Sequence, residues 1–176
     1  MRDTYIGFEA QKYLSNLSTY CTHAITLQTR LATHNVSAKQ MELMLENASR
    51  SVRQFNRRLA TKAYGNGATR KPNLYHPLII TAIEGTTNTY DNNRTLHAHI
   101  ALGNILTPTS NIKTEAQLRQ TIKDCWLATD YGVDDIDIKD MTSDRWITYI
   151  TKEIYDGNEE CVDWTNCHIP HAALLD

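Results

Sequence analysis

Residues 96–102 limit the possible folds of this chain more than any other segment. They read Leu-His-Ala-His-Ile-Ala-Leu and are followed by Gly103, which is typical of a β-strand that ends at a glycine. Alternate side chains of a strand share a face, so His97 and His99 project to the same side. Two neutral imidazoles one strand step apart can hold one divalent metal ion. A pair of polar surface histidines is the simpler interpretation, and the sequence on either side bears on the choice.

The segments around this strand predict an α+β fold. Their periodicities and their capping and turn residues give the order strand, helix, strand, strand, helix, strand, helix, after a short helix over residues 4–18. The predicted strands are 23–29, 78–84, 96–102 and 133–138, and the predicted helices are 37–64, 114–127 and 143–155. A β-α-β-β-α-β core of this kind forms a ferredoxin-like, split β-α-β antiparallel sheet with helices on one face.

The longest predicted helix carries a basic segment. It begins at a capping box, Ser37 followed by Gln40, and ends near Gly65. No acidic residue lies between residues 47 and 83 to balance the positive charges there. These charges belong to Arg50, Arg53, Arg57, Arg58, Lys62, Arg70 and Lys71. They predict a surface that binds DNA phosphates, although a solvated helix face gives the same pattern.

Composition limits the class of protein. The chain has 176 residues, 41% of them hydrophobic and 22% charged, which fits one folded domain over residues 1–176. No apolar run is long enough for a membrane helix, and the first residues lack the apolar core of a signal peptide. We therefore expect an intracellular protein with no membrane partner, cytoplasmic in a prokaryotic host and nuclear in a eukaryotic one. The net charge of −2 means that nucleic-acid binding requires a local basic patch.

We expect the four cysteines to be thiols and not disulfides, as is usual in an intracellular protein. The last two, Cys161 and Cys167, are followed by His168 and His171, and these are ligand types suited to zinc. Their spacing does not match the common zinc motifs, so a plain tail is the preferred interpretation over a structural zinc site.

Glu84 joins the two histidines in the predicted topology. It ends the apolar strand 78–84, and a polar connection over residues 85–94 leads from it to the histidine strand. A hairpin places the end of one strand beside the start of the next, so we expect Glu84 to lie beside His97 and His99.

The last predicted helix has two distinct faces. Three isoleucines at helical spacing form its apolar stripe, while Tyr149, Lys152 and Glu153 lie together on another flank, because positions i, i+3 and i+4 are neighbours. Taken alone, this flank is equally an ordinary tyrosine beside surface charges.

Together these pieces resemble the HUH endonucleases, and within that superfamily the single-tyrosine replication initiators (Rep type). The resemblance covers residues 22–156. The strand from Ala24 to Thr29 is similar to the first motif of the family, and His97-Ala98-His99 matches the second. Glu84 stands where many viral initiators have the acidic ligand, and Tyr149-Ile150-Thr151-Lys152-Glu153 matches the third motif, Tyr-x-x-Lys followed by an acidic residue.

The resemblance implies a function. His97, His99 and Glu84 would hold Mg²⁺ or Mn²⁺, and Tyr149 would attack a phosphodiester of single-stranded DNA to give a 5′-phosphotyrosine link and a free 3′-hydroxyl. Lys152 would position the phosphate or a metal-bound water, and Glu153 would orient Lys152 or reach the metal. The protein is then expected to nick and religate DNA at the start of rolling-circle replication, with a host replication helicase as a further partner.

Three other interpretations stay open on the sequence. A transposase or plasmid relaxase would use the same nicking step, although relaxases usually have a third histidine where this chain offers Glu84. An origin-binding module of the same fold would bind DNA without cutting it. A structural metal protein would combine the histidine pair with the tail that contains Cys161.

Overall fold

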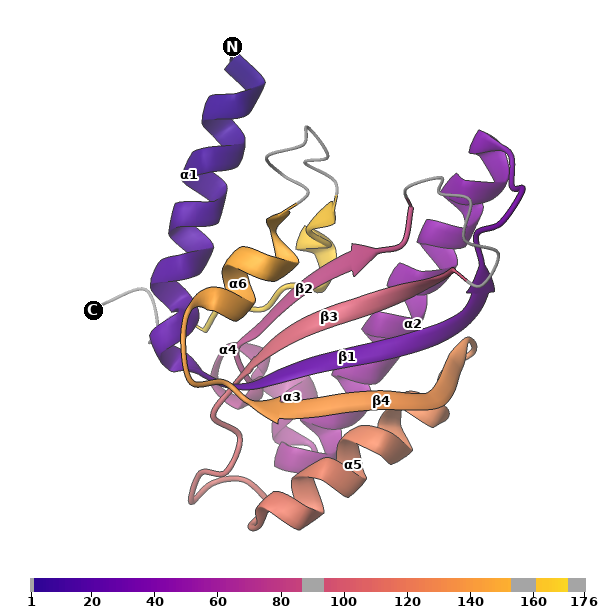
Figure 1. Cartoon of the computed structure of the whole chain (residues 1–176). Coiled ribbons are helices and arrows are strands. Elements are labelled where there is room, and N and C mark those ends of the chain that lie inside the picture. Colours follow the sequence, from indigo (N-terminus) through magenta and orange to yellow (C-terminus); the bar gives the residue numbers. More distant parts are fainter. Residues whose placement is uncertain (1, 87–93, 153–160, 171–176) are drawn as a thin grey trace.

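A four-stranded antiparallel sheet forms the centre of the protein (Figure 1). The computed structural model describes residues 2–86, 94–152 and 161–170. The sheet has the order β2-β3-β1-β4, and every neighbouring pair is antiparallel. Its strands are β1 (Cys21–Ala32), β2 (Ile79–Glu84), β3 (Thr95–Gly103) and β4 (Gly132–Asp140). The α+β class and the antiparallel sheet with helices are therefore as predicted, and the strand order is compatible with a split β-α-β arrangement.

Helices α2 (Ala38–Tyr64) and α5 (Glu115–Leu127) cover one face of this sheet. Both begin at capping boxes, in which a Ser or Thr hydroxyl and a Gln side chain each satisfy a backbone N–H group of the first turn. Phe55 of α2 meets Trp126 of α5 edge to face, and both pack on Ile100 and its neighbours in the main core. Alternation along β3 turns Ala98, Ile100 and Leu102 toward this layer.

A second helical layer lies against the other face, contrary to the expectation that all helices share one. It consists of α1 (Arg2–Asn16), the short 3-10 helix η1 (Leu17–Tyr20) and α6 (Arg145–Ile150). Leu14 and Ile147 pack there on Ile80 and Ala101. The prediction was wrong because the apolar residues of 4–18 were assigned to a lead segment, whereas they provide the cover for β2 and β3.

The last predicted helix is shorter than expected, since α6 ends at Ile150 and not at Tyr155. Thr151 leaves helical geometry, with φ −108° and ψ 10°, and its hydroxyl donates to the carbonyl of Ile147. Repeated β-branched residues in this stretch lower its helix propensity, which explains the early end. Tyr149 is thus helical, while Lys152 follows the helix.

Two further short helices, α3 (Gly67–Arg70) and α4 (Pro72–Tyr75), connect α2 to β2 and were not predicted. The C-terminal segment with η4 (Trp164–Asn166) lies along β2 and pairs with it at Ile79–His168 and Ala82–Val162. None of the four cysteines forms a disulfide, as expected. Among the described residues, no helix is long and apolar enough to cross a membrane.

Candidate metal centre and nucleophile

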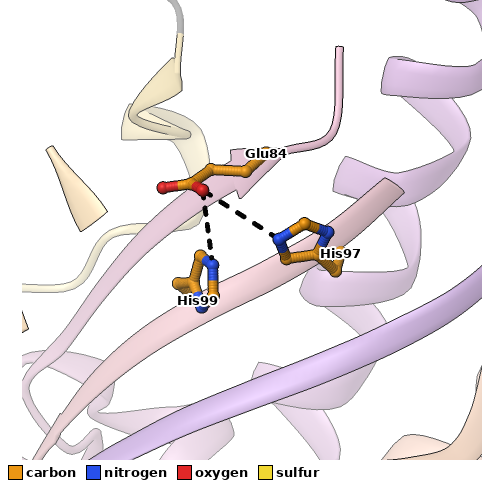
Figure 2. Close-up of side chains that lie close together, drawn as sticks. All are labelled: Glu84, His97 and His99. Atoms are coloured by element: carbon orange, nitrogen blue, oxygen red, sulfur yellow. Dashed lines mark ion pairs between the residues drawn. The ribbon is translucent and has the colours of Figure 1, made fainter. Parts of the chain in front are cut away.

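The register of β2 and β3 brings three side chains of the proposed site together. Glu84 is paired with His97, and Ala82 is paired with His99, so the three side chains project from adjacent positions on one face (Figure 2). This is the face opposite to α2, because Ala98 between the two histidines points into the main core. A hairpin-like pairing of β2 with β3 was the basis of the prediction, and Glu84 lies beside both histidines as expected.

The triad of Glu84, His97 and His99 is compact, and Glu84 and His99 are shielded from water while His97 is partly exposed. The Oε2 atom of Glu84 lies 3.5 Å from Nε2 of His99 and 4.0 Å from Nε2 of His97. Glu84 is 5% exposed and His99 is 3% exposed. Two ligands of one Mg²⁺ or Mn²⁺ ion lie about 3 Å apart when each metal–ligand distance is about 2.1 Å. A small inward movement of the imidazoles would therefore complete a three-ligand site.

Hydrogen bonds orient both imidazole rings. Nδ1 of His97 lies 3.2 Å from the carbonyl oxygen of Thr95, which can only accept, so Nδ1 carries the proton and Nε2 has a free lone pair. Nδ1 of His99 lies 3.1 Å from the Thr26 hydroxyl. The tautomer in which this nitrogen donates gives His99 a free Nε2 lone pair as well. Both lone pairs then belong to the nitrogens that face Glu84, as metal ligation requires.

The charge states also suit a cation. Burial alone would raise the pKa of Glu84, but the imidazole of His99, when its Nε2 carries a proton, and the ammonium group of Lys152 lower that pKa below its ordinary value. Burial is the main reason that the pKa of His97 is lowered, against the opposing effect of its hydrogen bond to Thr95. An ionised carboxylate and a neutral imidazole are the forms that bind a divalent ion.

Two buried atoms of this group have no hydrogen-bond partner among the described residues, namely Nε2 of His99 and Oε1 of Glu84. A buried polar atom without a partner is costly, so native proteins rarely contain one without a ligand, water or ion nearby. A divalent ion facing Nε2 of His99 would satisfy the imidazole nitrogen. The residues present therefore fit such an ion, and its identity is not specified by the geometry.

Tyr149 lies directly against this triad. Its ring centroid is 5.4 Å from that of His99, with the rings edge to face, and 5.4 Å from that of Trp146, with the rings stacked. Lys152 places its Nζ 3.8 Å from the centre of the Tyr149 ring and 2.6 Å from Oε2 of Glu84. Tyr149 is nevertheless 47% exposed, so a large substrate has access to it. The predicted nucleophile and the predicted ligands thus form one cluster.

Other predicted site residues do not join this cluster. Glu153 lies outside the described residues. The seven basic residues of the predicted DNA surface are exposed, but they belong to α2, α3 and the residue after α3, and α2 lies across the sheet from the triad. His171 of the tail is also outside the described residues. Cys167 instead accepts a hydrogen bond from the backbone N–H of Thr81.

Two residues of the cluster were missed by the sequence analysis. Thr26 lies opposite His99 in the β1–β3 register and contacts its ring. Trp146 stacks on Tyr149, packs edge to face on His99 and donates its Nε1–H to the carbonyl of Ile100. The signal for Trp146 was its position three residues before Tyr149 on the same helix, where side chains are neighbours.

A second group of potential ligands is His23, Glu115 and Asp140. Arg119 already pairs with both carboxylates, at 2.6 Å from Glu115 and 2.9 Å from Asp140. His23 approaches Glu115 to 3.0 Å. Because a guanidinium supplies the positive charge there, this group is an ion-pair network and not a candidate metal site.

The chain was compared with protein-family models, with curated proteins and with solved structures, and none of them matches it.

Proposed function

We propose that this protein is a metal-dependent endonuclease and strand transferase of the HUH type, which nicks and religates single-stranded DNA through Tyr149. The observation that carries the proposal is the contact of the Tyr149 ring with His99, one of the three residues that could hold the metal ion. The split β-α-β strand order of the sheet is compatible with the HUH nuclease fold. Initiation of rolling-circle replication is the biological role that the motifs favour, and a host replication helicase is then an expected partner.

The chemistry assigns each residue a task. The phenolic oxygen of Tyr149 attacks the phosphorus and the bond to the 3′-oxygen breaks, which leaves a 5′-phosphotyrosine and a 3′-hydroxyl. The phenol loses a proton and the leaving oxygen gains one, so the step is balanced, and its reverse religates the strand. His97, His99 and Glu84 would hold a divalent ion, which would supply charge neutralisation at the phosphate.

Lys152 and Trp146 prepare Tyr149 for this step. The ammonium group of Lys152 lies between the ring of Tyr149 and the carboxylate of Glu84, where it adds positive charge beside an incoming phosphate. Stacking on Trp146 restricts the orientation of the tyrosine ring. The half-exposed position of Tyr149 favours a single strand as substrate, because a tyrosine fixed to a helix needs an accessible backbone.

The experiment is a gel assay with 5′- and 3′-labelled pools of single-stranded oligonucleotides and Mn²⁺. We expect a slowly migrating protein–DNA adduct on the fragment 3′ to the cut, and we expect EDTA or Tyr149→Phe to abolish it. Tyr13→Phe is the matched control, since Tyr13 is 41% exposed and lies outside the site. A separate titration with Mn²⁺ should show binding that His97→Ala and His99→Ala weaken.

Other outcomes would identify the other functions. Cleavage that survives Tyr149→Phe would indicate a water nucleophile and a different nuclease class. Binding of DNA without cleavage would favour an origin-binding module. Binding of metal without any effect on DNA would favour a structural metal protein.

A further inference from the structure

A second feature of the surface, the α2 basic face, has no role in the proposed chemistry. It consists of Arg50, Arg53, Arg57, Arg58, Lys62, Arg70 and Lys71. All seven side chains are exposed. No carboxylate occurs between residues 47 and 83, so the whole stretch of chain that carries them is basic.

These cations lack carboxylate partners within the described part of the chain. The basic residues of neighbouring elements behave differently, because Arg119, Lys123 and Lys139 each form an ion pair with an acidic residue. An exposed cluster of like charges repels itself unless anions from solution or from a partner neutralise it. The α2 basic face is therefore complementary in charge to a polyanion.

The surface is hollowed on both sides of α2. A groove of about 670 Å³ lies between α2 and α5, lined by Arg57, Arg58 and Lys62, and Asp124 is its one acidic lining residue. A smaller hollow of about 200 Å³ lies between α2 and the C-terminal segment, lined by Arg53 and Arg57 among others. Arg57 belongs to both, so anionic groups on either side of the helix can reach cationic side chains.

This face is separated from the metal centre by the sheet. Phe55 and Leu59 of α2 pack on the side of β3 that presents Ala98 and Ile100, while His97 and His99 project from the opposite side. A single strand that places one phosphate at Tyr149 cannot present the same segment to Arg57. Any nucleic acid at the α2 basic face would therefore be a different stretch from the one at Tyr149.

The side chains of this face suit phosphates better than stacked bases. Among the side chains described, which begin at residue 9, the exposed tyrosines and tryptophans are Tyr13, Tyr149 and Trp164, and none of them lines either hollow. Sites for single strands combine cations with aromatic stacking platforms. Regularly spaced cations without such platforms are typical of binding to the duplex backbone.

We propose that the α2 basic face binds the phosphate backbone of duplex DNA, at a site across the sheet from the nicking centre. The choice of DNA as the polyanion rests on the proposed function. Duplex DNA next to the nicked strand would then be held by one layer of the protein while the other layer carries out the chemistry.

The test measures binding of a labelled duplex of mixed sequence by fluorescence anisotropy over a range of salt concentrations. The triple variant Arg53→Gln, Arg57→Gln, Arg58→Gln is compared with Lys12→Gln, Lys113→Gln, Lys139→Gln, which removes the same charge from exposed positions elsewhere. We expect the first variant to weaken duplex binding at least about tenfold and to reduce the slope of log Kd against log salt by about 2 to 3, since each lost phosphate contact removes about 0.9. The control should bind within about twofold to threefold of the wild type.

Three results would overturn this proposal: equal losses in the two triple variants, no duplex binding by the wild type, or a loss confined to single-stranded DNA of the same length. Circular dichroism of the variants, whose changed residues are exposed, confirms that they fold. The proposed nicking activity is tested independently of duplex binding. Tyr149→Phe should bind duplex as the wild type does, and the α2 variant should still form the covalent adduct on a short single strand.

Discussion

At the scale of single residues, Glu84 has two roles that compete. Its Oε2 atom faces both imidazoles and also accepts a hydrogen bond from Lys152 at 2.6 Å. A divalent ion bound to this oxygen would experience the positive charge of Lys152 at close range. The ammonium group therefore stabilises the carboxylate before metal binding and opposes the ion afterwards.

Replacement of Lys152 by Gln should raise the affinity for Mn²⁺ by about threefold to tenfold, because it removes a like charge a few ångströms from the ion. Calorimetric titration measures this effect, and Lys139→Gln, an exposed lysine on β4, should leave the affinity unchanged. The same Lys152 variant should form the DNA adduct more slowly. An unchanged or weaker affinity for Mn²⁺ would contradict the competition.

Trp146 positions the ring of Tyr149 by stacking on it. Its contact with the proposed metal ligand His99 is a packing contact between rings and not a hydrogen bond. Trp146→Ala should slow adduct formation at least about tenfold, because small displacements of a nucleophile are costly, whereas the affinity for Mn²⁺ should stay within about threefold of the wild type. Trp146→Phe keeps an aromatic ring and should recover much of the rate. Trp164→Ala serves as the control, since Trp164 is 46% exposed and the described ring contacts of Tyr149 are with His99 and Trp146. Equal losses of rate and metal affinity would indicate a purely structural role.

Most residues of the cluster around Glu84 could be predicted from the sequence, and the reason is physical. Strand alternation fixes that His97 and His99 share a face, and hairpin pairing fixes that Glu84 lies beside them. Thr26 could not be found in the same way, because its contact with His99 depends on the register between β1 and β3, which are far apart in the chain. Lys152 reaches Glu84 although the helix expected to carry it ends at Ile150.

At the scale of elements, α6 depends on α1 for its position. This short helix buries Ile147 and Ile150 and connects to α1 by a buried hydrogen bond, in which Nε2 of Gln11 donates to Oγ1 of Thr151 at 2.9 Å. The Thr151 hydroxyl in turn donates to the carbonyl of Ile147. Helix propensity could not predict this arrangement, because α6 is held by contacts with a segment over a hundred residues away in the chain.

Thr151→Val should lower the free energy of unfolding by about 1 to 3 kcal/mol, because it leaves the buried Gln11 amide without an acceptor. Urea denaturation measures this change. Thr148→Val, on α6 itself, is the matched control, and its exposed side chain predicts a change within about 0.5 kcal/mol. Similar effects of the two substitutions would show that the Gln11–Thr151 contact does not hold α6 in place.

At the scale of the whole molecule, the C-terminal segment closes the edge of the sheet at β2. His168 exchanges backbone hydrogen bonds with Ile79, and its ring packs on that of His76, with centroids 4.7 Å apart. Burial, with a smaller effect of nearby His168, lowers the pKa of His76 to about 4. Arg53 and Arg57 line the same hollow and add positive charge near this ring.

The lowered pKa of His76 makes the free energy of unfolding depend on pH in a defined direction. The pKa of His76 in the folded state lies below its unfolded value of about 6.5, so the unfolded state takes up the proton first and stability falls as pH drops from about 6.5 to about 4. The loss from this group is at most about 3 kcal/mol by pH 4, because the ring is only partly buried and solvent screens its charge. His76→Gln should lose that much less between pH 7 and pH 4 in urea denaturation, while His34→Gln, at an exposed position, should follow the wild type. Parallel curves for His76→Gln and the wild type would contradict this assignment.

The contact between Lys152 and Glu84 has a practical consequence for work with this protein. Because the buried carboxylate already has a cationic partner, we expect the chain to fold without a metal ion. It should then remain folded when it is purified and stored with a chelator, and it can be loaded afterwards with the ion of choice. Manganese, magnesium and other divalent ions can thus be compared on a single preparation that starts free of metal.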